Sequence, residues 1–274
     1  MTDNFTKFAP WLLRWALEPE GEPFETGYSK SLLMPVRRGG ARAMLKLAAD
    51  AEERRGAVQM AWWAGGGAAP VLEHEGEALL MTRLDGAQSL ADMAKTGRDD
   101  EASRVLCAVA DRLHAPRGAP PDGLVPLERW FRALAPAAAI HGGALAASNA
   151  TAQALFAEPR EPCVLHGDLH HANVLDGGAL GWLAIDPKGL FGERGYDYAN
   201  ILCNPDGPTA TAPGRLVAQA EVIAGAARLP LRRLLAWTHA HAGISAAWCM
   251  QDGFDPAAAL AIAEIARAEL TALS

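Results

Sequence analysis

The chain has 274 residues, of which 50% are apolar and 21% are charged, and its formal net charge is −7. This length suffices for one large domain or two modest ones, and the composition excludes disordered, collagen-like and small disulfide-rich proteins. The acidic balance argues against a protein that binds nucleic acid along its surface, because such binding needs an excess of Lys and Arg. A cationic or neutral small partner fits better.

The negative charge is concentrated in the second half of the chain. Residues 151–274 contain 13 acidic and 8 basic residues, against 19 and 17 in residues 1–150. Chance and solubility would explain this distribution. An acidic region would also attract a polycationic substrate.

The N-terminal segment and the cysteines bear on the cellular compartment. The first fifteen residues contain no basic stretch followed by a long apolar one, and no run reaches the roughly 18 apolar residues that a membrane span requires. The four cysteines are scattered without a C-x-x-C pair, which is typical of free thiols in a reducing cytosol. We expect a cytoplasmic protein with no membrane or nucleic-acid partner and no obligate protein partner.

The first 84 residues predict a small antiparallel sheet with one helix packed on it. Two apolar, strand-like segments, 31–36 and 43–47, lie on either side of a turn and indicate a hairpin. Residues 51–64 suit a helix that ends at the glycines of 65–67. A second hairpin is expected from 70–74 and 78–84, joined by the turn pair Glu75-Gly76.

Beyond residue 86 the sequence becomes rich in alanine and helical in pattern. Apolar residues at helical spacing predict helices over 101–114 and near 127–134, with several prolines between them. Residues 231–250 and 255–273 also indicate helices, the second with Asp255 as its cap. We therefore predict an α+β fold with an N-terminal lobe over residues 1–84 and a larger, mostly helical lobe over residues 85–274.

A polar loop flanked by short apolar strands carries the chemistry. It reads LHGDLHHANVL from residue 165, so that Asn173 follows Asp168 by five positions, and Asp186 ends the next apolar run. This spacing is typical of kinases, in which the first Asp orients the substrate hydroxyl and the Asn shares metal binding with the later Asp. Mg²⁺ prefers such oxygen ligands and neutralises charge on a nucleoside triphosphate. Asp168 is therefore the predicted catalytic residue, and Asn173 and Asp186 are the predicted metal ligands.

Other interpretations of this loop stay open. An Asp and an Asn at this spacing also occur by chance in structural turns. His166 is expected to anchor the loop through backbone hydrogen bonds more than to catalyse. A metallohydrolase is a further alternative, because three histidines and an aspartate cluster within 166–171. It would need more histidine ligands downstream, whereas His239 and His241 lie two apart on an expected helix and do not share a face.

The kinase hypothesis also predicts a lysine on a strand and a partner acid on the following helix. Lys46 lies within an apolar strand and needs a partner for its charge. Glu53 is the first choice and Glu52 the alternative. The segment that joins the lobes, with Thr82 and Leu84, is expected to present backbone groups to an adenine ring.

These motifs together resemble the aminoglycoside phosphotransferase superfamily. Residues 165–200, with HGDLHHAN, IDPKG and GERG, are most similar to its branch of streptomycin 6-phosphotransferases and hydroxyurea phosphotransferases, and the likeness is looser elsewhere. The resemblance implies a two-lobed, protein-kinase-like fold with ATP and Mg²⁺ as cofactors. It implies Asp168 as catalytic base, Lys46 with Glu53 as the phosphate-positioning pair, and Asp197 as a buried acid that braces the catalytic loop.

The sequence departs from a kinase pattern at two places. The turn expected to cover the phosphates reads ETGYSKS from residue 25 and lacks a G-x-G-x-x-G, so Ser29 and Ser31 are the expected phosphate contacts. The metal-binding Asp is followed by Pro187 and Lys188. We expect Lys188 to be solvated, with contact to a phosphate as the alternative.

The leading hypothesis is an ATP- and Mg²⁺-dependent kinase that transfers the γ-phosphoryl group to a hydroxyl of an aminoglycoside, streptomycin first. Asp206, Asp252 and Asp255 are the candidate contacts for a cationic acceptor. The alternatives are a kinase of hydroxyurea or of another small metabolite alcohol or amine, and a nucleotide-binding pseudoenzyme. A protein kinase is disfavoured because the stretch after Asp186 is too short for a long activation loop.

Overall fold

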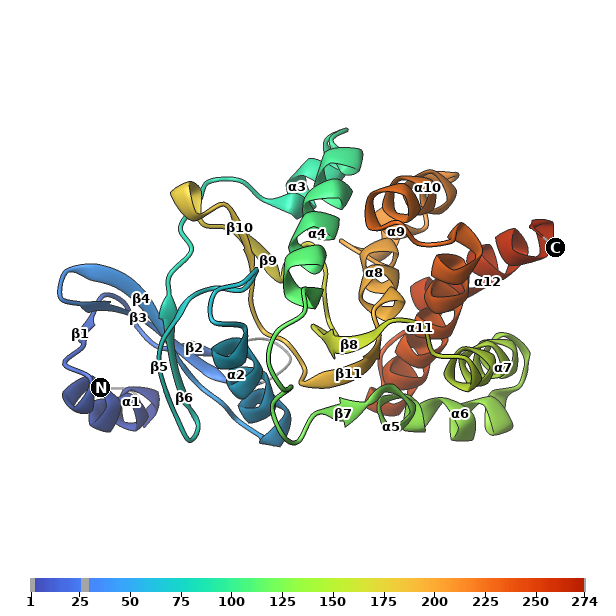
Figure 1. The fold of residues 1–274 in the computed structure, drawn as a ribbon. Coiled ribbons are helices and arrows are strands. Elements are labelled where there is room, and N and C mark those ends of the chain that lie inside the picture. The colour runs from blue at the N-terminus through green and yellow to red at the C-terminus, as the bar shows by residue number, and fades with distance from the viewer. Residues whose placement is uncertain (1–2, 26–29, 274) are drawn as a thin grey trace.

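The computed structural model describes residues 3–25 and 30–273, and its N-terminal part is built on an antiparallel sheet (Figure 1). The strands lie in the order β1 (Glu18–Pro19), β3 (Leu32–Arg38), β4 (Ala41–Leu47), β6 (Ala78–Thr82) and β5 (Val71–Glu75), and β2 (Phe24–Glu25) also pairs with β3. Both predicted hairpins are present. The second turns at Gly76-Glu77, one residue later than predicted, because β5 continues through Glu75 and the positive φ of 60° falls at Gly76.

The two faces of this sheet have different neighbours. Leu33, Lys46 and Leu79 are aligned across β3, β4 and β6. Because successive side chains in a strand point to opposite faces, Met34 and Leu45 face the other way. They pack in a separate apolar cluster with residues of α1 (Asp3–Arg14). The sequence predicts one helix beside this sheet, whereas the structure has a second, α1, which covers the face that would otherwise be exposed.

The predicted helix of the N-terminal part is α2 (Ala51–Trp63). Its N-terminus is capped by Asp50, whose carboxylate accepts hydrogen bonds from the amides of Glu52 and Glu53. Met60 and Trp63 are buried in the cluster that also contains residues of the C-terminal helices. In Figure 1, α2 therefore lies between the sheet and the rest of the molecule.

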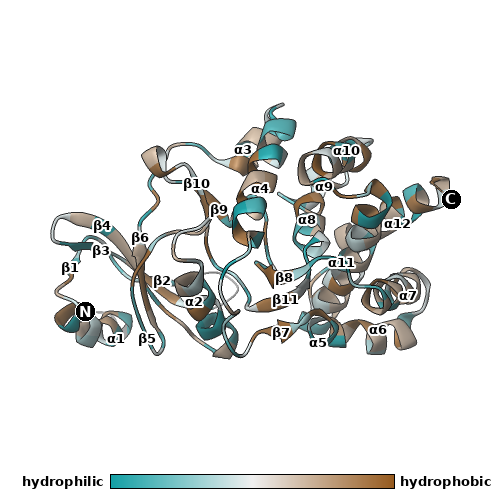
Figure 2. Cartoon of the chain, viewed as in Figure 1, coloured by the Kyte–Doolittle hydropathy of each residue, from teal (hydrophilic) through white to brown (hydrophobic). Residues whose placement is uncertain are grey.

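The C-terminal part is mostly helical, as predicted. Its helices are α3 (Leu90–Lys95), α4 (Asp99–His114), α5 (Leu127–Trp130), α6 (Leu134–His141), α7 (Gly143–Ala157), α8 (Gly195–Leu202), α9 (Gly207–Ala210), α10 (Arg215–Ala227), α11 (Leu231–Asp252) and α12 (Ala257–Ala272). The long helix α11 packs against α7, α8 and α12. Figure 2 shows apolar residues along β6 and β8 and a mixture of apolar and polar residues on α4. Together with the antiparallel sheet, these helices confirm the α+β fold.

Five short strands hold the polar loops of the C-terminal part. β8 (Pro162–Leu165) pairs antiparallel with β11 (Leu190–Glu193), which also runs parallel to β7 (Val125–Pro126). β9 (Val174–Asp176) and β10 (Trp182–Ala184) form a hairpin. The loop that carries Asp168 therefore connects β8 to β9, and the segment with Asp186 connects β10 to β11. No helix in the described ranges is long and apolar enough to cross a membrane.

Candidate active site

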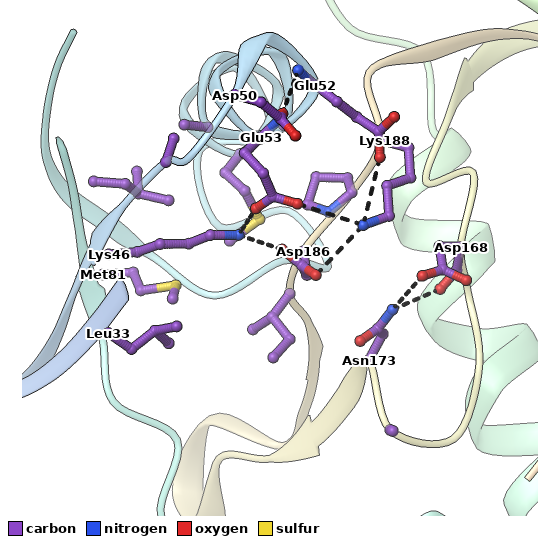
Figure 3. Close-up of a pocket in the computed structure, with 18 of the residues that line it drawn as sticks. Leu33, Lys46, Asp50, Glu52, Glu53, Met81, Asp168, Asn173, Asp186 and Lys188 are labelled. Carbon is purple, nitrogen blue, oxygen red and sulfur yellow. Dashed lines mark hydrogen bonds and ion pairs between the residues drawn. The ribbon is translucent and has the colours of Figure 1, made fainter. Parts of the chain in front are cut away.

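A cavity of about 800 Å³ lies between the N-terminal sheet and the loops of the C-terminal part (Figure 3). Its walls come from the sheet, from α2 and from the two polar loops. The lining residues include Leu33, Lys46, Leu79, Met81, Asp50, Glu52, Glu53, Met60, Asp168, His170, Asn173, Ile185, Asp186 and Lys188. Residues more than a hundred positions apart thus face one cavity, in which the sheet supplies apolar side chains and Lys46, while α2 and the loops supply the other charged groups.

Lys46 forms the charged centre of the sheet side. Its ammonium is in direct contact with the carboxylates of Glu53 and Asp186, and its side chain is only 11% exposed. A buried ammonium needs such partners, because its desolvation is otherwise costly. Of the two predicted partners, Glu53 is the one that contacts Lys46, and Glu52 lies 3.9 Å from Lys188.

Of the two serines expected to contact the phosphates, only Ser31 lies within the described residues. Ser29 lies outside the described residues. Ser31 is buried, donates its hydroxyl proton to Glu53 over 3.1 Å and accepts a hydrogen bond from the amide of Ala49. Its hydroxyl thus stands behind the Lys46–Glu53 pair and is not among the groups that line the cavity.

Asp168 lies on the opposite side of the cavity and accepts several hydrogen bonds. Its two carboxylate oxygens accept from the side-chain amides of Asn173 at 3.1 Å and Asn200 at 3.0 Å. The His170 ring lies 3.6 Å from the same carboxylate. Burial alone would raise the pKa of Asp168, but His170 and Lys188 outweigh it and lower the pKa to about 2. The group is therefore a carboxylate at neutral pH.

The loop that carries Asp168 is held by two buried residues. Asp197 accepts hydrogen bonds from the amides of His166 and Gly167, at 2.8 and 2.7 Å, and it also contacts the ring of His114 at 2.8 Å. The His166 ring accepts from the amide of Asp168, which leaves its other nitrogen to donate to the Ile185 carbonyl at 2.8 Å. Burial lowers the pKa of His166, so the ring is neutral and well suited to bridge the two loops.

Asn173 and Asp186 present oxygen atoms to the cavity. Asn173 donates its amide protons to Asp168, and Figure 3 shows its oxygen on the other side of that amide. Burial would raise the pKa of Asp186, but the charges of Lys46 and Lys188 lower it. Asp186 also has a positive φ of 63°, a conformation that is unfavourable for a residue with a side chain and is concentrated at functional sites. This pair of hard oxygen donors beside a cavity fits Mg²⁺, which takes one or two protein ligands and completes its shell with phosphates and water.

Lys188 corrects one expectation from the sequence. Its side chain is 13% exposed, not solvated, and its ammonium lies 3.5 Å from Asp186 and 3.6 Å from Glu53. Burial would lower the pKa of Lys188, but these carboxylates raise it above the usual value. The fold hides this side chain because α2 packs onto the segment that carries it.

The residues expected at an adenine ring lie at the edge of the cavity. The amide of Thr82 donates to the Pro70 carbonyl at 2.8 Å, and the amide of Arg83 donates to the Arg42 carbonyl at 3.4 Å. Neither Thr82 nor Leu84 lines the cavity, whereas Met81 does. The apolar surface available to a planar ring is therefore provided by side chains of the sheet.

The three acids predicted to contact a cationic acceptor do not line this cavity. Asp206 forms an ion pair with Lys95 at 2.7 Å and caps α9 through the amide of Thr209. Asp252 lies at the exposed end of α11. Asp255 is exposed and accepts a hydrogen bond from the amide of Ala257, but the N-cap of α12 is Pro256, so the predicted cap at Asp255 is one residue too early. Of the three, Asp206 lies nearest in sequence to the cavity, because Asn204 and Pro205 line it.

The cluster of histidines does not form a metal centre of the kind that a hydrolase needs. Within residues 3–25 and 30–273, no three His, Cys, Asp or Glu side chains gather where they would hold a metal ion. His166 is engaged by the loop, and downstream His239 and His241 contact Thr151 and Tyr196.

Sequence reasoning missed two residues that organise this site. Asn200 donates to Asp168 and accepts at its own oxygen from Asn204 over 3.0 Å. Gln59 on α2 donates to the Leu165 carbonyl at 2.6 Å and accepts from the amide of Gly189 at 2.9 Å. No local pattern marks Gln59, because its partners are more than a hundred residues away in sequence.

The comparison with known proteins identifies the family. Residues 14–253 match the family described as aminoglycoside/hydroxyurea antibiotic resistance kinase. The chain belongs to this family. The resemblance seen in the sequence is thereby confirmed, and so is the prediction of a phosphotransferase that acts on an alcohol group.

Several named relatives support this membership. A streptomycin 3″-kinase of Klebsiella pneumoniae is 50% identical over 88% of this chain and 91% of its own length. A streptomycin 6-kinase of Streptomyces griseus is 34% identical over 94% and 86%, and a hydroxyurea phosphotransferase of Kitasatospora aureofaciens is 32% identical over 90% and 73%. The chain is thus similar to three kinases that are named for different acceptors or acceptor positions.

Solved structures share the fold at low sequence identity. A choline/ethanolamine kinase family protein from Mesorhizobium loti matches 99% of this chain and 93% of its own with a TM-score of 0.66 and 15% identity. A thermostable mutant of an aminoglycoside phosphotransferase, in ternary complex with AMP-PNP and hygromycin B, matches 94% and 97% with a TM-score of 0.65 and 18% identity. These matches confirm the expected kinase-like fold.

Proposed function

We propose that this protein is an ATP- and Mg²⁺-dependent kinase that phosphorylates a hydroxyl of streptomycin. The observation that carries the proposal is the cavity that places the Asp168 carboxylate opposite the Lys46–Asp186 pair. The 50% identity to a streptomycin 3″-kinase over nearly the full length of both chains supports the choice of acceptor.

Asp168 is the residue we assign to the acceptor hydroxyl. In the transfer, the bond between the acceptor oxygen and the γ-phosphorus forms while the bond from that phosphorus to the β-phosphate oxygen breaks, and ADP leaves with the electron pair. Asp168 orients the hydroxyl and accepts its proton as the new bond forms. Its pKa of about 2 makes it a weak base, so orientation accounts for much of its contribution.

The opposite wall of the cavity is assigned to the nucleotide. Lys46, oriented by Glu53, would contact the phosphates that remain on ADP, while the apolar side chains of Leu33, Leu79 and Met81 would face the base. Asn173 and Asp186 would hold Mg²⁺. When bound, this ion supplies charge neutralisation on the phosphates.

Two details of the proposal rest on different observations. We assign the 3″-hydroxyl as the acceptor, because the relative with that specificity is 50% identical and the streptomycin 6-kinases are 34% identical. We place the reaction in the cytoplasm, because Cys107, Cys163, Cys203 and Cys249 are all free. The division near residue 84 into a nucleotide lobe and an acceptor lobe stays part of this proposal.

The direct test is an assay of purified protein with streptomycin, ATP and Mg²⁺. We expect ADP to be released in proportion to streptomycin consumed, and two-dimensional ¹H–³¹P NMR of the product to place the phosphate at the 3″ position. A product phosphorylated at the 6 position would contradict the regiochemistry alone. No streptomycin-dependent ADP release would contradict the acceptor.

A second acceptor is favoured by one specific observation. The matched family includes hydroxyurea in its description, and a hydroxyurea phosphotransferase is 32% identical to this chain. Hydroxyurea is therefore the first compound to assay if streptomycin is not phosphorylated. If neither streptomycin nor hydroxyurea is phosphorylated, small metabolite alcohols and amines are the next acceptors to assay. A protein that binds ATP but phosphorylates none of these compounds would be a pseudoenzyme.

A further inference from the structure

Lys188 lies where two loops and a helix meet. Its backbone amide donates to the His166 carbonyl at 2.8 Å, and the following residue, Gly189, donates to the side chain of Gln59. The backbone is therefore fastened to the catalytic loop on one side and to α2 on the other. The side chain lines the cavity and is 13% exposed, so the position of its ammonium is set by the fold.

The ammonium of Lys188 is surrounded by carboxylates without being tied closely to any one of them. Its contacts with Asp186, Glu53 and Glu52 measure 3.5, 3.6 and 3.9 Å. Each is longer than the roughly 2.7–2.9 Å of a charge-assisted hydrogen bond. Lys46, in contrast, is in direct contact with both Glu53 and Asp186. These three contacts are therefore electrostatic attractions between charged groups, and in none of them does an N–H of Lys188 form a short hydrogen bond.

Lys188 also stands beside the path that a phosphoryl group would take. Figure 3 shows its ammonium between the carboxylates of Asp186 and Asp168, and the charges of Lys188 and Asp168 act on each other. In the proposed reaction, the nucleotide phosphates lie on the side of Asp186 and the acceptor hydroxyl on the side of Asp168. The transferring group therefore has to cross the space next to this ammonium.

We infer that Lys188 is a catalytic residue whose ammonium donates to a non-bridging oxygen of the phosphoryl group during transfer. The inference rests on the proposed function and extends it. Negative charge is spread over the three equatorial oxygens of a transferring phosphoryl group, and a fixed cation that touches them stabilises the transition state. Lys188 keeps its proton throughout, since the acceptor proton goes to Asp168. The two lysines thus contact different phosphates. Lys46 contacts those that remain on ADP, and Lys188 contacts the phosphoryl group that is transferred to the acceptor.

The experiment compares two nucleotides in Lys188→Met, the variant that keeps the length of the side chain without its charge. Calorimetric titration in Mg²⁺ measures the affinity for ADP and for the β,γ-imido analogue of ATP, which carries the additional phosphate. We expect the affinity for the analogue to fall about tenfold to a hundredfold, with ADP affected less than about threefold. The kcat is expected to fall about 10²- to 10³-fold. Equal losses for both nucleotides, or an unchanged affinity for the analogue, would overturn the inference.

A structural role as a counter-ion for the acids predicts a different result. If Lys188 only neutralises its neighbours, the double variant Glu52→Gln/Lys188→Met would recover the affinity for the analogue, because one excess acid is gone. We expect no recovery. Lys7→Met, on the exposed side of α1, is the matched control and is expected to leave both affinities unchanged. Thermal unfolding shows whether each variant folds, and Lys188→Gln replaces Lys188→Met if the latter does not.

These binding measurements need no acceptor. A wild-type protein that fails to phosphorylate streptomycin but shows the analogue-specific loss in Lys188→Met would contradict the proposed function and leave this inference standing. If the wild-type protein phosphorylates streptomycin and Lys188→Met loses affinity equally for ADP and for the analogue, the proposed function stands and this inference is contradicted.

Discussion

Asp168 and Asp197, which lie at the loop between β8 and β9 and on α8, carry the same charge as the aspartates at the ends of the outer helices, in opposite surroundings. Asp168 and Asp197 accept hydrogen bonds from several side chains and amides, and Asp197 is 1% exposed. Asp252 and Asp255 are exposed, and the one hydrogen bond described above for Asp255 serves its own helix. The positions of the first pair are therefore fixed from several sides, and of the two only Asp168 lines the cavity.

Asp206 lies between these extremes. It is tied to Lys95 and to the start of α9, and it follows directly after two residues that line the cavity. By the number of their hydrogen bonds and ion pairs and by their nearness to the cavity, Asp168 comes first, Asp206 second, and Asp252 and Asp255 last.

The largest effect is expected from Asp168→Asn. The amide cannot accept the acceptor proton, and its NH₂ group would face the amide of Asn173 or Asn200. We expect kcat to fall about 10²- to 10⁴-fold, roughly 3 to 5 kcal/mol of barrier, with the affinity for ADP unchanged. A steady-state assay against the control Asp252→Asn measures it. A loss of less than about tenfold would mean that Asp168 is not the group that orients the hydroxyl.

Asp197→Asn should act on stability as well as on rate. The change removes the charge that accepts from His166, Gly167 and His114, and it leaves at least one of those donors without an acceptor. We expect the free energy of unfolding to fall by about 1.5 to 3 kcal/mol. Urea denaturation, with the exposed Asp255→Asn as control, gives the value. A change equal to that of the control would show that the loop does not depend on this carboxylate.

The response to salt should separate Asp168 from Asp206. The pKa of Asp206 is lowered mainly by its hydrogen bond with Lys95, an ion pair near the surface that salt screens, so 1 M NaCl should raise this pKa toward its ordinary value. Asp168 depends on partners inside the cavity, and its pKa of about 2 should change little.

Both pKa values are depressed, so each carboxylate adds stability above its unfolded-state pKa of about 4, and that stability is lost as the pH falls through the folded value. Carboxyl chemical shifts recorded between pH 1.5 and 6 at two salt concentrations provide the measurement. If the higher salt concentration changed the two pKa values by the same amount, the proposed difference in surroundings would be contradicted.

The smallest effect is expected from Asp252→Asn and Asp255→Asn. If neither carboxylate reaches the acceptor, the KM for streptomycin should change by less than about twofold in each, and Asp206→Asn should change it more. A rise of about tenfold or more in the first two variants would instead support the sequence-based expectation that they bind a cationic acceptor. The same assay with hydroxyurea, which carries no positive charge, serves as the control.

The sequence predicted most of what is local in this molecule. The hairpins of the N-terminal sheet, α2 and the loop from His166 to Asn173 could be found because turn glycines, apolar periodicity and the spacing of polar residues lie within a few positions of each other. The resemblance added Asp197, and the structure brings it to the loop as expected.

What the sequence could not show depends on packing between distant segments. The burial of Lys188 follows from the approach of α2, and the role of Gln59 follows from partners over a hundred residues away. The sequence does not reveal helix α1, because the residues on which it packs are alternate positions of β3, β4 and β6, and their pattern predicts only strands. The strands β1 and β2 have two residues each, too few for a periodic pattern.

Gly56 decides how closely α2 approaches the segment after Asp186. A Cβ added at this position would lie 2.2 Å from the carbonyl oxygen of Pro187, so only glycine allows the helix to rest there. The contact joins the helix that bears Glu53 to the loop that bears Asp186 and Lys188. We therefore expect the charged side of the cavity to be assembled before any ligand binds. In that case none of the binding free energy is spent on selecting a rare conformation, and a larger residue at 56 would show its cost first as weaker nucleotide affinity.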